Sequence, residues 1–168
     1  MTLPNALTSL RILFIPLLVT LLLLPGYRIA SVVLFAILAL SDLIDGMLAR
    51  WLKQRSVAGA LFDPLADKIL VISTLMILVE LGELSSIPVI IIVARELLVT
   101  GLRVLIAAKK EVMPASLSGK WKTVFQMIAA FMLIMNIPYG LTVLWIAVIL
   151  TVISGIEYFW GGRKYLNG

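Results

Sequence analysis

Cysteine and histidine are both absent from this sequence of 168 residues. Without cysteine there is no disulfide, no thiolate nucleophile and no sulfur ligand for a metal. Without histidine the chain lacks the side chain that most often acts as acid or base near neutral pH. Any chemistry must therefore depend on carboxylates, hydroxyl groups, lysines and arginines.

Charged residues are also scarce, at 14%, whereas apolar residues make up 62% and the mean hydropathy is +1.13. Soluble domains carry roughly 45–50% apolar and about 25% charged residues, so the composition indicates a membrane protein. A membrane-crossing helix needs about 20 residues. Six stretches qualify: residues 8–24, 29–50, 59–81, 86–108, 118–137 and 139–160. The predicted fold is an all-α polytopic membrane protein, with residues 1–168 forming one domain.

The distribution of basic residues predicts the orientation of these six spans. Eleven lysines and arginines fall on one side: Arg11, Arg50, Lys53, Arg55, Arg103, Lys109, Lys110, Lys120, Lys122, Arg163 and Lys164. The other side has Arg28 together with Glu80 and Glu83, which we expect to be solvated. The positive-inside rule places both termini in the cytoplasm. The first stretch ends without a small-residue cleavage site, so we interpret it as a retained helix. The basic residues flank the spans instead of forming a separate face, which argues against nucleic-acid binding.

Four aspartates lie within 26 residues, at the cytoplasmic ends of the second and third spans. Asp42 and Asp45 are three residues apart, and Asp63 and Asp67 are four apart, so each pair shares a helix face. Placing a carboxylate inside the bilayer costs about 2.5–3.5 kcal/mol on insertion scales, which makes a function expected. Two antiparallel neighbours would bring the four together. Oxygen ligands without nitrogen or sulfur suit Mg²⁺ or Mn²⁺.

Other interpretations of these residues remain open at this point. The aspartates could instead cap helices separately or pair with Arg50 and Lys68. Asp63 and Pro64 fit the first two positions of a helix, although Pro64 could also kink a helix already begun. The small residues nearby either allow close helix packing or leave room for a bulky ligand. Arg50 is within reach of a phosphate beside the cations.

The spacing of these residues resembles a known signature. Asp42-Leu-Ile-Asp45-Gly46-Met-Leu-Ala49-Arg50 is followed by eight residues, Gly59, three residues, Asp63, three residues and Asp67. All eight signature positions of the CDP-alcohol phosphatidyltransferases match, at every gap. The resemblance implies that an alcohol attacks the lipid-side phosphorus of a CDP-linked lipid and releases CMP. It also implies two metal ions on the four aspartates, with Asp67 as general base. The residues implied to hold the cytidine diphosphate are Gly46, Ala49, Arg50 and Gly59.

Three further segments resemble the bacterial phosphatidylglycerophosphate synthases within this family. They are residues 4–11 with Asn5 and Thr8, the segment from Arg95 and Glu96 to Arg103, and residues 119–126. This resemblance implies CDP-diacylglycerol as donor, glycerol 3-phosphate as acceptor, a homodimer and a bacterial inner membrane, with the active site facing the cytoplasm. We predict that Asn5, Thr8 and Arg11 line the nucleotide side, unless they only cap the first helix and anchor it at the membrane interface.

The acceptor that this resemblance implies is a small dianion, which would need cations in the same cavity. The candidates are Arg95, Arg103, Lys120 and Lys122. Lys120 and Lys122 could instead be ordinary topological charges. Arg95 and Glu96 point about 100° apart on a helix and need not pair. Two rival functions remain: a sibling enzyme that uses another acceptor, such as inositol phosphate, serine or a second phosphatidylglycerol, and a carboxylate-lined cation transporter.

Overall fold

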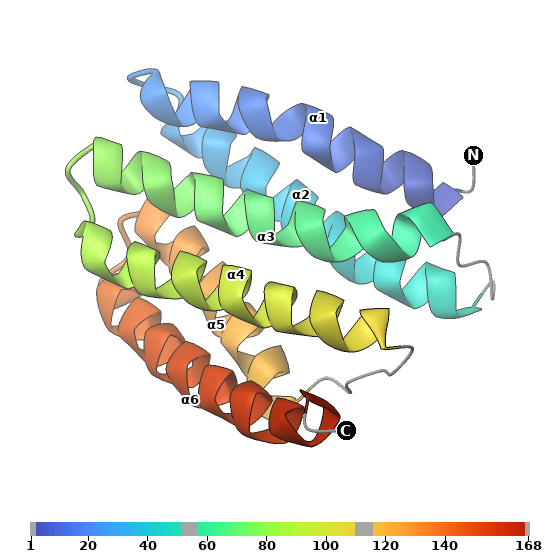
Figure 1. Cartoon of the computed structure of the whole chain (residues 1–168). Coiled ribbons are helices and arrows are strands. Elements are labelled where there is room, and N and C mark those ends of the chain that lie inside the picture. The colour runs from blue at the N-terminus through green and yellow to red at the C-terminus, as the bar shows by residue number, and fades with distance from the viewer. Residues whose placement is uncertain (1–2, 52–56, 110–115, 167–168) are drawn as a thin grey trace. The chain divides into compact units, whose positions relative to one another are not determined.

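Six helices account for nearly all of the described residues in the computed structural model (Figure 1). The structure describes the backbone of residues 3–51, 57–109 and 116–166, and the side chains of residues 10–41, 68–109 and 116–164. No strand occurs in these ranges, which confirms the all-α prediction. The helices are α1 Leu3–Leu23, α2 Arg28–Trp51, α3 Val57–Glu80, α4 Ser86–Ala108, α5 Leu117–Ile134 and α6 Gly140–Leu166.

Turn-forming residues separate the helices where the sequence stops favouring helix. Gly82 adopts a φ of 72° after α3, and the Gly82 and Glu83 amides donate to the carbonyls of Val79 and Leu78. This is a Schellman motif, in which a left-handed residue closes the last helical turn. Asn136 (φ 53°) has the same role after α5.

The chain divides into two compact units. The first contains residues 1–84 together with Ala130–Ile137, and the second contains Ser85–Ala129 and Pro138–Gly168. In the first unit α1 packs against both α2 and α3, and α2 also contacts α3. Its core is apolar and fully buried around Leu18, Phe35 and Leu75. In the second unit α4 packs against α6, and Val99, Leu102, Ile106 and Tyr158 form a buried cluster.

One arginine joins three segments of the first unit. Arg28, at the start of α2, donates two hydrogen bonds of 2.6 Å to the Glu83 carboxylate. It also donates to the carbonyls of Leu133 and Ile134 and to Asn136 Oδ1. The hydrogen bond with Arg28 holds the pKa of Glu83 below its ordinary value and raises the pKa of Arg28. Glu83 is exposed to solvent, as expected, and is in addition the ion-pair partner of Arg28.

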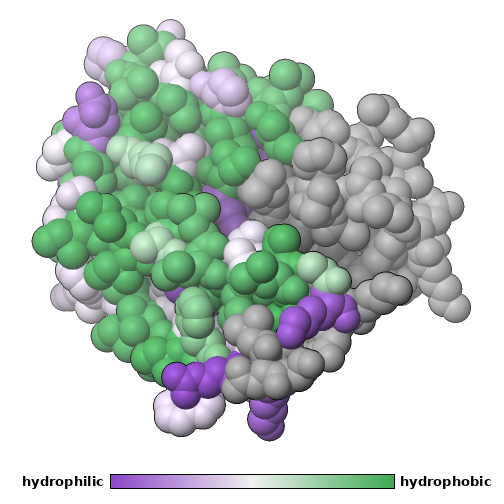
Figure 2. Space-filling model, viewed as in Figure 1, coloured by the Kyte–Doolittle hydropathy of each residue, from purple (hydrophilic) through white to green (hydrophobic). Residues whose placement is uncertain are grey.

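Large apolar side chains point outward along the helices. Ile29, Leu97 and Val104 are 79%, 69% and 63% exposed. Hydrophobic residues cover most of the coloured surface in Figure 2. Soluble monomers rarely expose apolar areas of this extent. Among the described residues, Gly140–Lys164 is long and apolar enough to cross a membrane, while Leu10–Leu23 and Arg28–Ser41 are shorter apolar helices. Six crossings therefore remain a prediction.

Candidate functional site

The predicted metal-binding aspartates lie on two helices of the first unit. Asp42 and Asp45 belong to α2, and Asp63 and Asp67 belong to α3. The backbone is helical through both pairs, so each pair shares a face as the spacing predicted. Their side chains lie outside the described residues, so the convergence of the four carboxylates stays a prediction. The all-oxygen donor set nevertheless suits a hard divalent cation. Among the described side chains there is no group of three or more potential metal ligands.

The residues predicted to hold the CDP-lipid also lie on α1 to α3. Their side chains, too, are outside the described residues; they are Asn5, Thr8, Gly46, Ala49, Arg50 and Gly59. The backbone does decide one alternative. Helix α3 begins at Val57, six residues before Asp63, so Asp63 and Pro64 lie within the helix. The interpretation of this pair as the start of a helix was wrong, and the alternative of a helix already begun is confirmed.

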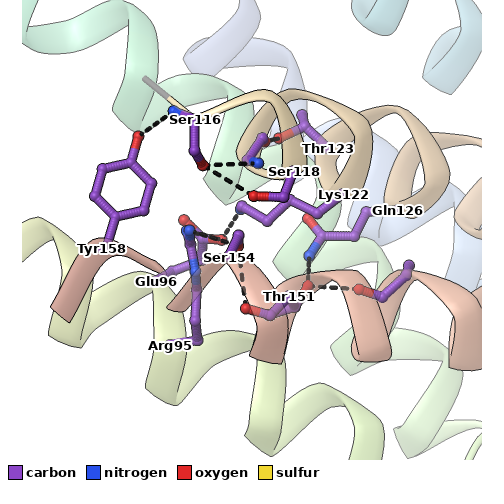
Figure 3. A network of polar contacts seen from close by, with 12 residues as sticks. Arg95, Glu96, Ser116, Ser118, Lys122, Thr123, Gln126, Thr151, Ser154 and Tyr158 are labelled. Carbon is purple, nitrogen blue, oxygen red and sulfur yellow. Dashed lines mark hydrogen bonds and ion pairs between the residues drawn. The ribbon is translucent and has the colours of Figure 1, made fainter. Parts of the chain in front are cut away.

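A buried cluster of ionised side chains lies in the second unit (Figure 3). Arg95 and Glu96 come from α4 and Lys122 from α5, and all three are at most 9% exposed. Glu96 Oε1 accepts a hydrogen bond from Arg95 Nη1 at 3.2 Å and forms an ion pair with Lys122 Nζ. The adjacent residues Arg95 and Glu96 therefore do pair, and the same carboxylate oxygen also contacts Lys122.

Polar side chains of α5 and α6 surround this cluster. Arg95 Nη2 donates to Ser154 Oγ at 2.8 Å, and Ser154 Oγ donates to the Thr151 carbonyl at 3.1 Å. Gln126 Nε2 donates to Thr151 Oγ1 at 3.0 Å. The Arg95 Nε atom is buried and has no hydrogen-bond partner among the described residues. Buried polar groups are normally paired. A network of ionisable side chains among apolar helices of this kind indicates a function.

A second arginine of α4 extends the cationic region through Tyr158 of α6. Arg103 Nη2 donates to the Tyr158 hydroxyl at 2.8 Å, and the Ser116 amide donates to the same oxygen at 3.2 Å. The guanidinium carbons of Arg95 and Arg103 lie 5.4 and 5.0 Å from the centre of the Tyr158 ring. Cation–π contacts at these distances orient both arginines. Lys120, by contrast, is exposed on α5.

The cluster carries an excess of positive charge. Among the described residues, Arg95 and Lys122 are two cations and Glu96 is one anion, which gives these three side chains a formal charge of +1 in a buried setting. Positive charge in such a setting favours an anionic ligand such as a phosphate. Lys122 is only 5% exposed, so it is not a solvated charge at a helix end. That alternative remains open for Lys120.

Sequence reasoning missed two members of this arrangement. We gave Glu96 no role, and Tyr158 belongs to no motif that we singled out. Their partners lie 26 and 55 residues away along the chain. Only the adjacent ionisable pair within a predicted span, which is rare in membrane helices, pointed to this position.

Comparison with known proteins supplies the family. A family model described as CDP-alcohol phosphatidyltransferase matches residues 1–153. Three relatives share the name CDP-diacylglycerol–glycerol-3-phosphate 3-phosphatidyltransferase. The protein of Bacillus subtilis is 38% identical, with 98% of each chain covered. That of Rickettsia bellii is 37% identical, over 97% of this chain and 96% of its own. That of Pseudomonas fluorescens is 37% identical, over 99% and 89%. The chain therefore belongs to the CDP-alcohol phosphatidyltransferase family.

Proposed function

We propose that the protein transfers the phosphatidyl group of CDP-diacylglycerol to glycerol 3-phosphate, giving phosphatidylglycerol phosphate and CMP. Family membership and the names of three relatives support the reaction and argue against a cation transporter. The observation that carries the choice of acceptor is the buried cluster of Arg95, Glu96 and Lys122, because its excess positive charge suits a phosphorylated alcohol. Serine and glycerol have no phosphate group that could pair with that charge.

In the proposed reaction a hydroxyl oxygen of glycerol 3-phosphate forms a bond to the lipid-side phosphorus of CDP-diacylglycerol. The bond between that phosphorus and the bridging oxygen breaks, and CMP leaves with the electron pair. Asp67 takes the proton of the attacking hydroxyl. Two ions of Mg²⁺ or Mn²⁺ on Asp42, Asp45, Asp63 and Asp67 would neutralise the diphosphate and stabilise the leaving group.

The side chains of the chain itself bind and orient the two substrates. Arg50 and the small residues Gly46, Ala49 and Gly59 hold the cytidine diphosphate, with Asn5 and Thr8 on the nucleotide side. Arg95 and Lys122 bind the acceptor phosphate, and Arg103 and Lys120 add positive charge. Glu96 keeps Arg95 and Lys122 in place before the acceptor arrives, since the carboxylate contacts both. Preorganised donors of this kind lower the cost of ordering a ligand.

We also propose a single domain of six spans in the inner membrane of a bacterium, with both termini in the cytoplasm and with a homodimer as the assembly. The lengths of the helices support the spans, since 18 to 27 residues correspond to about 27–40 Å and the hydrocarbon core is about 30 Å thick. The outward apolar side chains agree with lipid contact. The excess of basic residues between alternate helices supports the orientation.

Release of CMP from CDP-diacylglycerol by the purified protein in detergent tests the function. Glycerol 3-phosphate should support release in the presence of Mg²⁺ or Mn²⁺, and a chelator should abolish it. Inositol phosphate, serine and glycerol serve as competing acceptors. Release with one of these alone would retain the chemistry and overturn the acceptor. No release with any acceptor would overturn the proposal as a whole.

The acceptor site is tested separately by Lys122→Gln, with Lys164→Gln as a matched loss of one cation elsewhere. Lys122→Gln should raise the KM for glycerol 3-phosphate by roughly tenfold or more, since a charged hydrogen bond contributes about 1.5–3 kcal/mol. The KM for CDP-diacylglycerol should change little. Equal effects on both substrates would contradict the assignment of Lys122 to the acceptor.

A further inference from the structure

A groove of about 530 Å³ runs between α4 and α6 of the second unit. Its walls are apolar, formed by Ile91, Ala94 and Leu98 on α4 and by Val152, Ile156 and Phe159 on α6. The polar groups that line it are two arginines, Arg95 and Arg163, and the indole of Trp160. The groove therefore combines an apolar channel with one cationic group, that of Arg163, because the Arg95 guanidinium is bonded to Glu96 and Ser154. A volume of this size accommodates a substantial part of a small ligand.

Close packing of α4 on α6 forms the floor of the groove. A Cβ atom at Gly155 would lie 3.3 Å from Arg95 Cγ, and one at Gly162 would lie 3.0 Å from Leu102 Cδ2. Both contacts join residues sixty positions apart, so α4 and α6 run in the same direction. The absence of a side chain at Gly155 lets the Arg95 stem cross towards Ser154 and Glu96. The guanidinium of Arg95 is thus engaged inside the unit, and its aliphatic stem lines the groove.

The groove has the length of one membrane leaflet. Val152 and Arg163 are eleven residues apart on α6, which corresponds to about 16 Å of helix. Half of a hydrocarbon core of about 30 Å is about 15 Å. Trp160 and Arg163 lie in the last turns of α6, the end that we place at the cytoplasmic surface. An acyl chain in the groove would therefore end near the bilayer centre while its headgroup lay at Arg163.

Arg163 gives the groove a charge preference. It is exposed in the last turn of α6, and its guanidinium carbon lies 5.8 Å from the centre of a Trp160 ring. This contact holds the cation beside the groove at the level where indoles occupy a membrane interface. A phosphodiester that carries net negative charge complements Arg163, whereas the ammonium group of a zwitterionic lipid offsets that attraction.

We propose that this groove is a binding site for one anionic phospholipid of the cytoplasmic leaflet, with an acyl chain along α4 and α6 and the phosphate at Arg163. The site rests on the membrane orientation given under the proposed function, and it is separate from the substrate sites proposed there. One basic residue near a membrane surface contributes about 1 kcal/mol towards anionic lipid, which corresponds to about fivefold in binding. The expected selectivity is therefore modest and depends on Arg163.

Quenching of Trp160 fluorescence by brominated lipids measures this selectivity. The parent protein carries phenylalanine at the other three tryptophans, Trp51, Trp121 and Trp145, and is reconstituted with brominated phosphatidylglycerol or phosphatidylcholine. We expect phosphatidylglycerol to bind about fivefold more strongly. Arg163→Gln should reduce that ratio to near one, whereas Lys164→Gln, a matched loss of charge outside the groove lining, should retain it.

A pair of neighbouring leucines tests the groove itself. Leu98 lines it, whereas Leu97 is also exposed and does not. In the same background, which keeps Trp160 and has phenylalanine at Trp51, Trp121 and Trp145, Leu98→Phe should weaken quenching of the Trp160 indole, because the larger ring occupies the groove. Leu97→Phe should not. Phenylalanine adds bulk without contributing to the tryptophan emission. The proposal would be overturned by equal effects of both changes or by a selectivity ratio of one in the parent. It would also be overturned if quenching were lost because a second copy covers the groove. CMP release by the same preparations reports separately on the proposed function.

Discussion

Replacing Glu96 with glutamine removes one negative charge from a buried cluster and keeps the size of the side chain. Glu96 is 4% exposed, and its Oε1 atom contacts both Arg95 and Lys122. Removing one partner of a buried ion pair costs about 3–5 kcal/mol, because the other charge stays buried without compensation. For a chain of this size that loss corresponds to a Tm lower by roughly 6–20 °C.

The double variant Glu96→Gln with Lys122→Met tests whether the contact between these two side chains accounts for the loss of stability. When both partners are neutral, no uncompensated charge of this pair remains buried. The double variant should therefore be more stable than the sum of the single changes predicts, by a coupling energy of about 1–3 kcal/mol. The KM for glycerol 3-phosphate should nevertheless stay raised, since the cation at position 122 is still missing.

Thermal unfolding in detergent and CMP release at varied acceptor concentration give these two quantities on the same preparations. Leu97→Gln, an exposed change on the same helix, controls for the effect of adding an amide to α4. Additive losses of stability would refute the reasoning that Glu96 and Lys122 form a coupled buried pair. A normal KM in the double variant would refute the role of Lys122 towards the acceptor.

Three further changes test other parts of the molecule. Asp67→Asn should abolish CMP release while equilibrium binding of CDP-diacylglycerol persists. A variant that bound CDP-diacylglycerol poorly but still released CMP would contradict the role of Asp67 as base. Because Arg28 lowers the pKa of Glu83, that carboxylate contributes stability at neutral pH, which is lost as the pH falls through its lowered folded-state pKa. Glu83→Gln should therefore lower the free energy of unfolding at neutral pH by up to about 1 kcal/mol, a small loss because the pair is one-third exposed. The free energy of unfolding of this variant should also fall less steeply as the pH is lowered. An equally steep fall would show that Glu83 contributes no stability through Arg28. Gly155→Ala should lower the Tm and raise the KM for the acceptor, because its Cβ would lie 3.3 Å from Cγ of Arg95. An unchanged KM would show that Arg95 can shift without weakening the binding of the acceptor.

The helices were predictable because each is specified by local sequence. The stretch predicted at 86–108 coincides with α4, where Ser85 accepts a hydrogen bond from the Ile87 amide and caps the helix. The third helix begins at Val57, two residues before the predicted stretch and seven before Pro64, so Pro64 is accommodated within α3 instead of starting it. Apolar composition and turn residues thus locate helices well, while a proline alone does not decide a boundary.

The candidate site was predictable only where a motif has fixed spacing. The four aspartates were found because their gaps of three and four residues are helical repeats. The pairing of Glu96 with Lys122, and of Arg103 with Tyr158, depends on which helices pack together and at what rotation. Neither quantity follows from the period of one helix. Likewise, the Arg28–Glu83 pair joins residues on different connections, so each looked like an isolated surface charge.

The contacts of Arg28 have a consequence for the order in which the protein is made. Its partners include Glu83 and the carbonyl of Ile134, 55 and 106 residues further along the chain. A chain synthesised from its N-terminus carries the Arg28 side chain without its last partners until α5 has been translated. The first unit, which includes Ala130–Ile137, therefore reaches its final form only after most of the second unit's sequence has emerged. Truncation before residue 130 should leave α1 to α3 without these contacts of Arg28, as an unfinished intermediate that is less resistant to proteolysis than the full chain.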